Sequence, residues 1–579
     1  MVTSVPPPPS GADYYDVGAF TRNVKTRSSD AQVWFNRGLI WSYAFNHLEA
    51  VRCFRYAIQH DPTCVMAHWG VAYAIGPNYN KPWELHDEQE LLDTLRNARQ
   101  AALDAIAHIT PETDPVERAL AHAILTRYPE TAKGKEFLEW NTKYADAMQK
   151  VYDSNGQDLD VAALYADSLM NLAPWDLWDL ETGLPRSKSR TLEVQAVLEK
   201  AMADPSSSSH PGPLHLYIHV MEMSATPEKA LKTSHLLLGL VPDGGHLEHM
   251  PSHINLLVGD YAGAMKSNRL AIVADAKYAV RSSSTDFYTF YRLHNIQTFL
   301  YAAMHAGRLA DSLWAVDLLE AATPESTLRI ESPPLADWLE TVLNARAHVL
   351  VRFGRWQEIL DLTLPTETEL YSVTVANIHY AKGVAYAALG RVDEAISERK
   401  VFHSAISRIP PSRIIYPNRC VDVIQIGVAM LDGEIEYRRG NFDLAFDRLD
   451  EAVSLSDALI YTEPPAWMQP PRHALAGLKL EQGLVGEALD IYATDLGLNQ
   501  KLSRPLQHPN NVWALHGYHE CLVTLERTEE AKAVEGQLAT ALSLADIPVY
   551  ASCFCATGNE ARKITSSSGA VRACCNGTQ

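Results

Sequence analysis

Histidines are concentrated in one stretch of this chain, residues 210–253, which holds seven of the protein's 22 histidines. Within it His215 and His219 are four residues apart, and Glu222 follows three residues later. Residues four apart in an α-helix lie on one face, so this spacing predicts two imidazoles and one carboxylate directed at a common point. Helical metal sites use the same spacing.

A second histidine pair follows soon after the first. His249 and His253 are again four residues apart, and both pairs lie among apolar residues of predicted helices. The alternative is that all four are structural histidines, since most isolated histidines on apolar helix faces are simply hydrogen-bonded. Two pairs so close together favour a metal-binding or catalytic cluster, because several buried imidazoles satisfy one another poorly unless a cation lies among them.

Polar residues also interrupt other aromatic helical segments. Aromatic residues at helical spacing are more often core than ligand-binding, but asparagines in such segments are less easily explained by packing. We expect these polar residues to contact a substrate in a pocket, or to hydrogen-bond the imidazoles and so fix their tautomers. His294, in the middle of an aromatic helix, is expected to join the cluster as a ligand. The residues expected to contact the substrate or support the imidazoles are Asn46, Asn78, Trp175, His246, Tyr291 and Gln297.

Charge and composition exclude several classes of function. The 579-residue chain has a formal net charge of −20, which argues against nucleic acid or an anionic membrane as the main partner, because both select for Lys and Arg. No apolar run reaches the ~18 residues that span a bilayer. The N-terminus lacks a basic segment followed by an apolar core, so we expect a cytoplasmic protein. Eight cysteines are too sparse for a disulfide framework.

A repeat pattern begins near residue 30. Large and small residues follow the spacing of the tetratricopeptide repeat, an antiparallel helix pair of about 34 residues in which large side chains fill gaps left by small ones. Similar units recur around 383–395 and 433–452, and weaker ones follow in LAGLKLEQGLVGEALDIY and WALHGYHECLVTLERTEEAKAV. No convincing period-2 alternation is present. We predict an all-α fold, with a disordered Pro-rich arm over 1–29, a continuous solenoid of tetratricopeptide-like hairpins over 30–555 and a disordered tail over 556–579. The matching residues of the first repeat are Trp34, Gly38, Trp41, Ala50, Phe54, Ala57 and Pro62.

The chain resembles a family of tetratricopeptide-domain proteins found in bacteria, with fungal members. Besides the first repeat, the resemblance rests on the segments LYADSLMNLAPWDLW, HPGPLHLYIHVMEMS, GHLEHMPSHINLLVGDY, YRLHNIQTFL and ASCFC, and it covers about residues 30–555. Relatives carry a second histidine where this chain has Gln297, so a ligand at that position in them would be absent here. The resemblance implies no particular reaction. The positions that match the family's characteristic polar residues are His215, His219, Glu222, His246, His249, His253 and His294.

The predicted donor set limits which metal ions fit. Imidazole-dominated sites suit copper, zinc, iron or nickel, whereas Mg²⁺ and Ca²⁺ require more oxygen ligands. Six histidines would serve two ions, about three each, an arrangement that suits O₂ activation by copper. One ion with an open position would suit hydrolysis by metal-bound water. Copper is slightly favoured over zinc and iron, because Cys553 and Cys555 form a Cys-x-Cys pattern of soft donors near the C-terminus.

Three functions are consistent with these features. The first is a copper-type oxidoreductase of secondary metabolism that acts on a small organic molecule inside the helical array. The second uses zinc, or His and Glu without metal, for hydrolysis or isomerisation. The third is a non-enzymatic adaptor that binds a protein or peptide through its repeats. The expected metal ligands are His215, His219, Glu222, His249, His253 and His294, and the expected catalytic groups are Glu222 and His47.

Overall fold

The structure, a computed structural model, describes residues 14–131, 136–282 and 287–556. Regular structure in these ranges is almost all helical, which confirms the predicted all-α fold class. The exception is a short antiparallel ladder between β1 (Ile414–Ile415) and β2 (Asn418–Arg419), in which the first residue of β1 pairs with the last of β2. In these same ranges, no helix is both long and apolar enough to cross a bilayer.

The sequence predicted one continuous array, and the helices group into two compact units, each of which is described by itself. The boundary falls within α14 (Tyr288–His305). Unit 1 comprises Met1–Thr298, Ile330–Pro333 and Ser503–Pro505, and unit 2 comprises Phe299–Arg329, Pro334–Leu502 and Leu506–Gln579.

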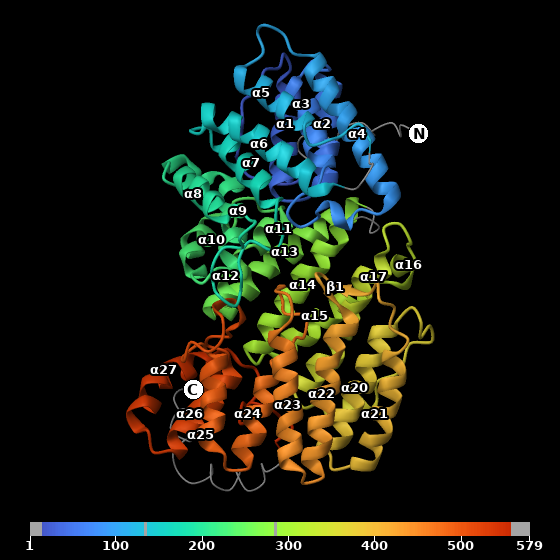
Figure 1. The fold of residues 1–579 in the computed structure, drawn as a ribbon, viewed down its shortest axis with the longest axis vertical. Coiled ribbons are helices and arrows are strands. Elements are labelled where there is room, and N and C mark those ends of the chain that lie inside the picture. The colour runs from blue at the N-terminus through green and yellow to red at the C-terminus, as the bar shows by residue number, and fades with distance from the viewer. Residues whose placement is uncertain (1–13, 132–135, 283–286, 557–579) are drawn as a thin grey trace, which may run out of the picture. The chain divides into compact units, whose positions relative to one another are not determined.

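Both units consist of helices packed against their neighbours in sequence (Figure 1). The helices of unit 1, besides the first part of α14, are α1 (Ser29–Tyr43), α2 (His47–His60), α3 (Val65–Ile75), α4 (Glu88–Ala107), α5 (Pro115–Leu125), α6 (Phe137–Asn155), α7 (Leu159–Met170), α8 (Thr191–Met202), α9 (Pro211–Glu222), α10 (Leu231–Leu237), α11 (Gly245–His249), α12 (Pro251–Val258) and α13 (Tyr261–Arg281). Those of unit 2 are α15 (Leu309–Ala322), α16 (Glu325–Leu328), α17 (Leu335–Leu339), α18 (Ala345–Arg352), α19 (Trp356–Leu360), α20 (Ser372–Ala388), α21 (Val392–Ile406), α22 (Cys420–Arg438), α23 (Phe442–Asp457), α24 (Pro471–Glu481), α25 (Val485–Asp495), α26 (Val512–Thr524) and α27 (Thr528–Leu544). Short 3₁₀ turns lie at Trp83–Leu85, Pro205–Ser209, Pro227–Ala230, Glu340–Asn344 and Arg504–Leu506.

The first hairpin shows the large-into-small packing that the repeat pattern predicts. Phe54 on α2 is fully buried, and its ring lies against Gly38 of α1 and Gly70 of α3. A Cβ atom added at Gly38 would lie 2.7 Å from the Phe54 ring, and one at Gly70 would lie 2.5 Å from it. The same logic recurs in unit 2, where a Cβ at Gly433 would lie 2.7 Å from Leu449. The fold is therefore a tetratricopeptide-like stack of helical hairpins within each unit.

Substitution of Gly38 by alanine is expected to destabilise unit 1 by about 1–3 kcal/mol, because the new methyl group overpacks the Phe54 ring. Denaturant unfolding followed by tryptophan fluorescence measures the change. Gly536→Ala in α27 is the matched control, since a Cβ there would meet no atom within 4 Å, and it should leave stability unchanged or raise it. Equal effects of the two substitutions would contradict this account of the hairpin.

The prediction of disorder over residues 1–29 is wrong for residues 14–28, which pack on unit 1. The Arg22 guanidinium donates to Asp158 at 2.8 Å and to Asp160 at 2.7 Å. These partners lie far along the chain, so local composition and periodicity could not indicate them. The remaining residues of the predicted arm, and the predicted tail after residue 556, lie outside the described residues.

Unit 2 contains a buried histidine, His348 on α18, whose ring packs edge-on against Trp467 with centroids 4.7 Å apart. Burial lowers the pKa of His348 to about 4. The folded state therefore binds fewer protons at this position than the unfolded state, whose histidine titrates at about 6.5. Its contribution to stability is complete above that pH and falls as the pH drops towards 4.

We expect lowering the pH from about 7 to about 5 to remove about 2 kcal/mol of stability through His348 alone. A His348→Phe variant should lose that part of the pH dependence, because it has no group to protonate. Denaturant midpoints of both proteins at the two pH values provide the measurement. Identical pH slopes in wild type and variant would show that this histidine is not held neutral.

Candidate metal centre

Four helices of unit 1 carry the clustered histidines. α9 begins at Pro211, where the His210 ring caps the helix by accepting from the Gly212 N–H at 3.2 Å. It presents His215 and His219, one turn apart, on the same side. The second pair lies on two short helices, since Pro251 starts α12 directly after α11. Met250 between them keeps helical backbone angles, so the four-residue spacing still brings its two histidines together.

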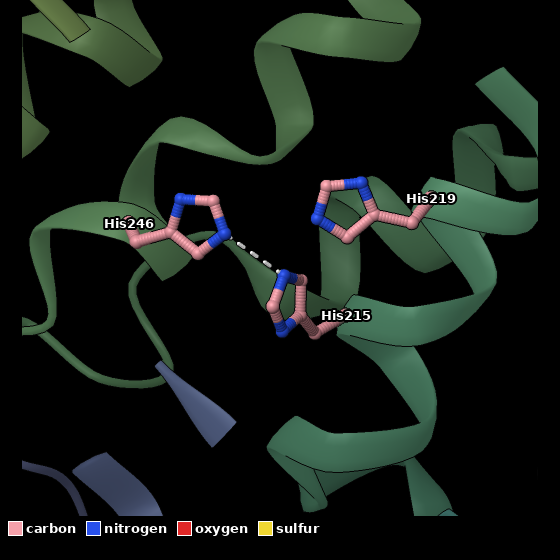
Figure 2. A group of neighbouring side chains, drawn as sticks. All are labelled: His215, His219 and His246. Carbon is pink, nitrogen blue, oxygen red and sulfur yellow. Dashed lines mark hydrogen bonds between the residues drawn. The ribbon is translucent and has the colours of Figure 1, made fainter. Parts of the chain in front are cut away.

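The first group of three imidazoles is formed by His215, His219 and His246 (Figure 2), referred to below as triad A. One ring nitrogen from each lies within 4.8 Å of one from each of the others. The Nε2 atoms of His215 and His246 are 3.0 Å apart, and all three rings are buried. The sequence prediction assigned His246 to substrate contact or support, whereas the structure gives it the position of a ligand.

The second group, triad B, is formed by His249, His253 and His294. The Nε2 atom of His249 lies 2.7 Å from that of His253 and 3.1 Å from that of His294. An ion at ~2.0–2.1 Å from two imidazole nitrogens requires those nitrogens to be no more than about 4.2 Å apart, and these separations meet that requirement. All five histidines predicted as ligands therefore lie in one of the two triads.

Hydrogen bonds at the opposite ring nitrogen fix how these imidazoles are protonated. Nδ1–H of His215 donates to the Tyr43 carbonyl at 2.7 Å. Nδ1–H of His249 donates to the amide oxygen of Asn268 at 2.6 Å, and the Asn268 NH₂ in turn donates to the Ala264 carbonyl at 2.9 Å, which sets the amide orientation. With Nδ1 protonated, Nε2 of each neutral ring carries a lone pair directed into its triad.

Glu222 connects the two triads. One of its carboxylate oxygens accepts from Nδ1 of His219 at 2.9 Å, and the other accepts from Nδ1 of His253. Burial alone would raise the pKa of Glu222, but the imidazoles of His253 and His219 hold it below its usual value. This geometry makes Glu222 a positioning residue for both triads, and its roles as ligand or base stay predictions.

Most of the six triad rings lie in an environment that disfavours protonation. Burial, together with the neighbouring imidazoles, lowers the pKa of His215, His246 and His249 well below the usual value, and that of His294 to about 3. The Nε2 atoms of His249 and His253 lie 2.7 Å apart. Two unprotonated nitrogens would repel at this distance in a buried site, and a bound cation would turn that repulsion into ligation.

A cavity of about 500 Å³ in unit 1 adjoins triad A. Phe45 and Tyr291 line it, and their ring centroids lie 5.3 and 4.9 Å from that of His246. Phe45 also contacts the His215 ring at 4.5 Å and adopts a positive φ of 53°, which side chains rarely take. One aromatic ring therefore separates the cavity from the imidazoles.

Three of the polar residues predicted near the site line this cavity. Asn46 caps α2 by accepting from the Glu49 N–H at 3.3 Å, and its buried NH₂ has no hydrogen-bond partner in the described part of the chain. Nε2 of His47 lies 3.5 Å from the Asn78 amide nitrogen, and burial lowers the pKa of His47 to about 4. His47 is thus a neutral group of the cavity wall and belongs to neither triad.

Other site residues follow the prediction less closely. Trp175 lies edge-on to His219 at 6.2 Å. Gln297 is half-buried one turn beyond His294 on α14, outside both triads. Asn268 and Phe45 were missed, because one lies on a polar helix and the other in a tight turn, and neither position carries a periodic signal.

Cys553 and Cys555 are joined as a disulfide and belong to unit 2. The prediction used these cysteines as soft donors in favour of copper. In this state their sulfur atoms are bonded to each other and are not thiolate ligands, so that argument no longer holds. The free cysteines among the described residues, Cys53, Cys64, Cys420 and Cys521, are all buried.

Comparison with known proteins identifies no family for this chain. No protein-family model and no curated protein matches the chain. Among solved structures, it is similar to yeast Tom70 (14% identity over 89% of this chain and 92% of that one, TM-score 0.25). It is also similar to the APC/C hetero-tetramer Cut9–Hcn1 (11% identity over 90% of this chain and 96% of that one, TM-score 0.23). A third similar structure is Naa15/Naa10 bound to HypK-THB (14% identity over 88% of this chain and 70% of that one, TM-score 0.19). Similarity at these TM-scores indicates nothing about activity or partners.

Proposed function

We propose that this protein is a metal-dependent oxidoreductase that binds two copper ions, one in each triad, and oxidises a small organic molecule. The observation that carries the proposal is the convergence of ring nitrogens in triad B, where Nε2 of His249 lies 2.7 Å from that of His253 and 3.1 Å from that of His294. Three imidazole nitrogens grouped in this way can ligate one ion.

The donor set favours copper. Each triad offers three imidazoles, and the nearby carboxylate of Glu222 is engaged by two Nδ1–H groups. Imidazole nitrogens suit copper, zinc and iron, while hard ions prefer oxygen. Two copper ions could together accept two electrons, which matches the oxidation of a substrate SH₂ by O₂ to S and H₂O₂. Five of the six rings are buried and His294 is half-buried, which would limit the access of bulk water to the ions.

The first test is elemental analysis of the purified, tag-free protein, before and after reconstitution with copper, zinc or iron in turn. The expected result is two copper ions per chain, together with an optical or paramagnetic copper signal. Stoichiometric zinc in place of copper would contradict oxidation and favour hydrolysis or isomerisation as the function. Failure to retain any of the three ions would refute the metal centre.

The 500 Å³ cavity is the proposed substrate site, because it is separated from triad A by one ring and presents the unpartnered NH₂ of Asn46. Asn46→Asp keeps the helix cap, since Asp caps as well as Asn, but replaces the donor with an acceptor. We expect KM to rise at least about tenfold, because the substrate loses one hydrogen bond in a buried site. Steady-state kinetics of the copper-loaded protein measure it, with metal content and melting temperature as controls. An unchanged KM would place the substrate elsewhere.

A second candidate function is that of an adaptor, which the fold itself favours. Stacked helical hairpins commonly present extended surfaces for peptides or proteins, and Gly38, Phe54 and Gly70 show this packing in the first repeat. In that case partner binding would be unaffected when triad histidines are replaced. The adaptor function would be favoured by a purified partner of known sequence that binds wild type and the His215→Ala/His249→Ala variant with equal affinity.

A further inference from the structure

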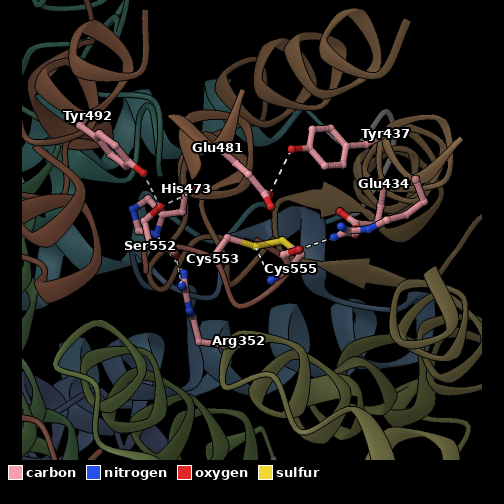
Figure 3. The surroundings of a disulfide bond; sticks show 10 residues. Arg352, Glu434, Tyr437, His473, Glu481, Tyr492, Ser552, Cys553 and Cys555 are labelled. Atoms are coloured by element: carbon pink, nitrogen blue, oxygen red, sulfur yellow. Dashed lines mark hydrogen bonds and ion pairs between the residues drawn. A yellow bond between two sulfur atoms is a disulfide. The ribbon is translucent and has the colours of Figure 1, made fainter. Parts of the chain in front are cut away.

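The last described segment of unit 2 carries a disulfide between cysteines only two positions apart. Cys553 and Cys555 are bonded, with Cα atoms 5.3 Å apart (Figure 3). A loop this short removes little conformational freedom from the unfolded chain, so the bond stabilises the fold less than a longer loop would. Stabilisation of the fold therefore does not explain why this disulfide is present.

Two arginines hold the backbone around this disulfide. Arg352, at the end of α18, donates to the Ser552 carbonyl, and Arg438, at the end of α22, donates to the Cys555 carbonyl. The Ser552 hydroxyl also donates to the His473 carbonyl at 3.1 Å. None of these bonds involves sulfur, so they hold the two cysteines side by side whether or not the disulfide is present.

The two guanidinium groups differ in their charge partners. Arg438 pairs with Glu434 at 2.6 Å. Arg352 is buried, and among the described residues its partners are neutral: the Nδ1 of His473 at 3.0 Å, a backbone carbonyl and the face of Trp513 at 4.0 Å. Its Nε has no hydrogen-bond partner in the described part of the chain. Arg352 therefore brings a positive charge that no carboxylate contacts directly.

Cys553 is the more exposed of the two cysteines. Both line a narrow cavity of about 30 Å³ that Arg352 also lines, and Cys553 is half-buried, whereas Cys555 is 5% exposed. The backbone N–H of Cys555 also donates to Cys553 Sγ at 3.3 Å. A nearby cation and an N–H donor both stabilise a thiolate over a thiol.

We infer that Cys553 and Cys555 form a thiol–disulfide exchange centre, separate from the histidine triads, that oxidises and reduces external thiols. In the reduced form the Cys553 thiolate attacks a disulfide RS–SR, which forms a mixed disulfide and releases RS⁻. The Cys555 thiolate then attacks Cys553 Sγ, which closes the protein disulfide and releases the second RS⁻. The two cysteine protons end on the two released thiols, so one disulfide is reduced as the other forms. The reverse sequence consumes two external thiols RSH and forms RS–SR.

The first test equilibrates the full-length protein with defined ratios of reduced and oxidised dithiothreitol, followed by acid quench, alkylation and mass spectrometry. The two cysteines should change together at one midpoint, while the buried free cysteines, Cys53 and Cys420 among them, stay unmodified in the native protein. A pair that is never oxidised, or one that is reduced only when the protein unfolds, would overturn the proposal.

The second test separates the role of Arg352 from mere structure. In reduced protein carrying Cys555→Ser, the rate of Cys553 alkylation is followed against pH. Arg352→Gln should slow alkylation near neutral pH about tenfold, the effect of raising a thiolate pKa by about one unit. Arg352→Lys keeps the charge and should restore most of the rate if both variants fold, as circular dichroism would check. A pH profile unchanged in the Gln variant would remove Arg352 from the centre.

Discussion

Replacement of His249 by alanine is expected to lower the copper content of the reconstituted protein from two ions per chain to one. His249 is the middle ligand of triad B, since its Nε2 lies 2.7 Å from that of His253 and 3.1 Å from that of His294. Its loss leaves two imidazoles, too few to hold the ion against chelation. Adding His215→Ala, which opens triad A in the same way, should reduce the content to near zero. Elemental analysis referenced to protein quantified by amino-acid analysis measures the stoichiometry.

The control for this experiment is another buried histidine. His348→Phe removes an imidazole in unit 2 that belongs to neither triad, and it should leave two copper ions per chain. Equal copper in His249→Ala and wild type would mean that the metal binds elsewhere. Loss of copper in the His348 variant would point to a general folding defect as the cause.

Glu222→Gln is expected to weaken copper binding by about 10–100-fold while leaving all six imidazoles in place. The carboxylate accepts from Nδ1 of His219 and from Nδ1 of His253 with its two oxygens. An amide has only one oxygen, so its NH₂ would face one of the two Nδ1–H groups, donor against donor. That imidazole must then rotate or change tautomer, and the lone pair directed at the ion is lost. Competition with a Cu(I) chelator of known affinity gives the change in Kd.

Glu248→Gln is the matched variant for this comparison. Glu248 is also buried in α11, but it accepts from the Gly239 N–H at 3.0 Å and contacts no triad Nδ1. Burial raises the pKa of Glu248 to about 7, so the neutral amide resembles a form that the native side chain already adopts. Similar affinities for the two variants would show that Glu222 contributes bulk alone and does not orient the imidazoles.

Several features of this protein were readable from the sequence because they depend on residues close together in the chain. The spacing of Trp34, Gly38 and Phe54 predicted the first hairpin, and the Phe54 ring lies against Gly38 in the structure. The four-residue spacing of His215 and His219 placed two imidazoles on one side of α9. Helical geometry alone determines such relations, so no knowledge of the tertiary fold was needed.

The division into two triads depended on the tertiary structure. Nothing in the spacing shows that His246, on α11, faces His215 on α9, or that His294, from α14, completes the other group. These contacts between histidines depend on how separate helices pack against one another. The same applies to residues 14–28, where Arg22 pairs with Asp158 and Asp160, more than a hundred residues away.

The role of Glu222 is the clearest example of this limit. Its position three residues after His219 indicated a carboxylate near the imidazoles, and a ligand, a base and a hydrogen-bond acceptor all share that spacing. The structure favours the last, because the second oxygen meets Nδ1 of His253 from another helix. The sequence by itself determined which side chains share a helix face, since that is a local property of the backbone. Tertiary packing decided which faces meet and which ring nitrogen each partner occupies, because those depend on contacts between residues far apart in the chain.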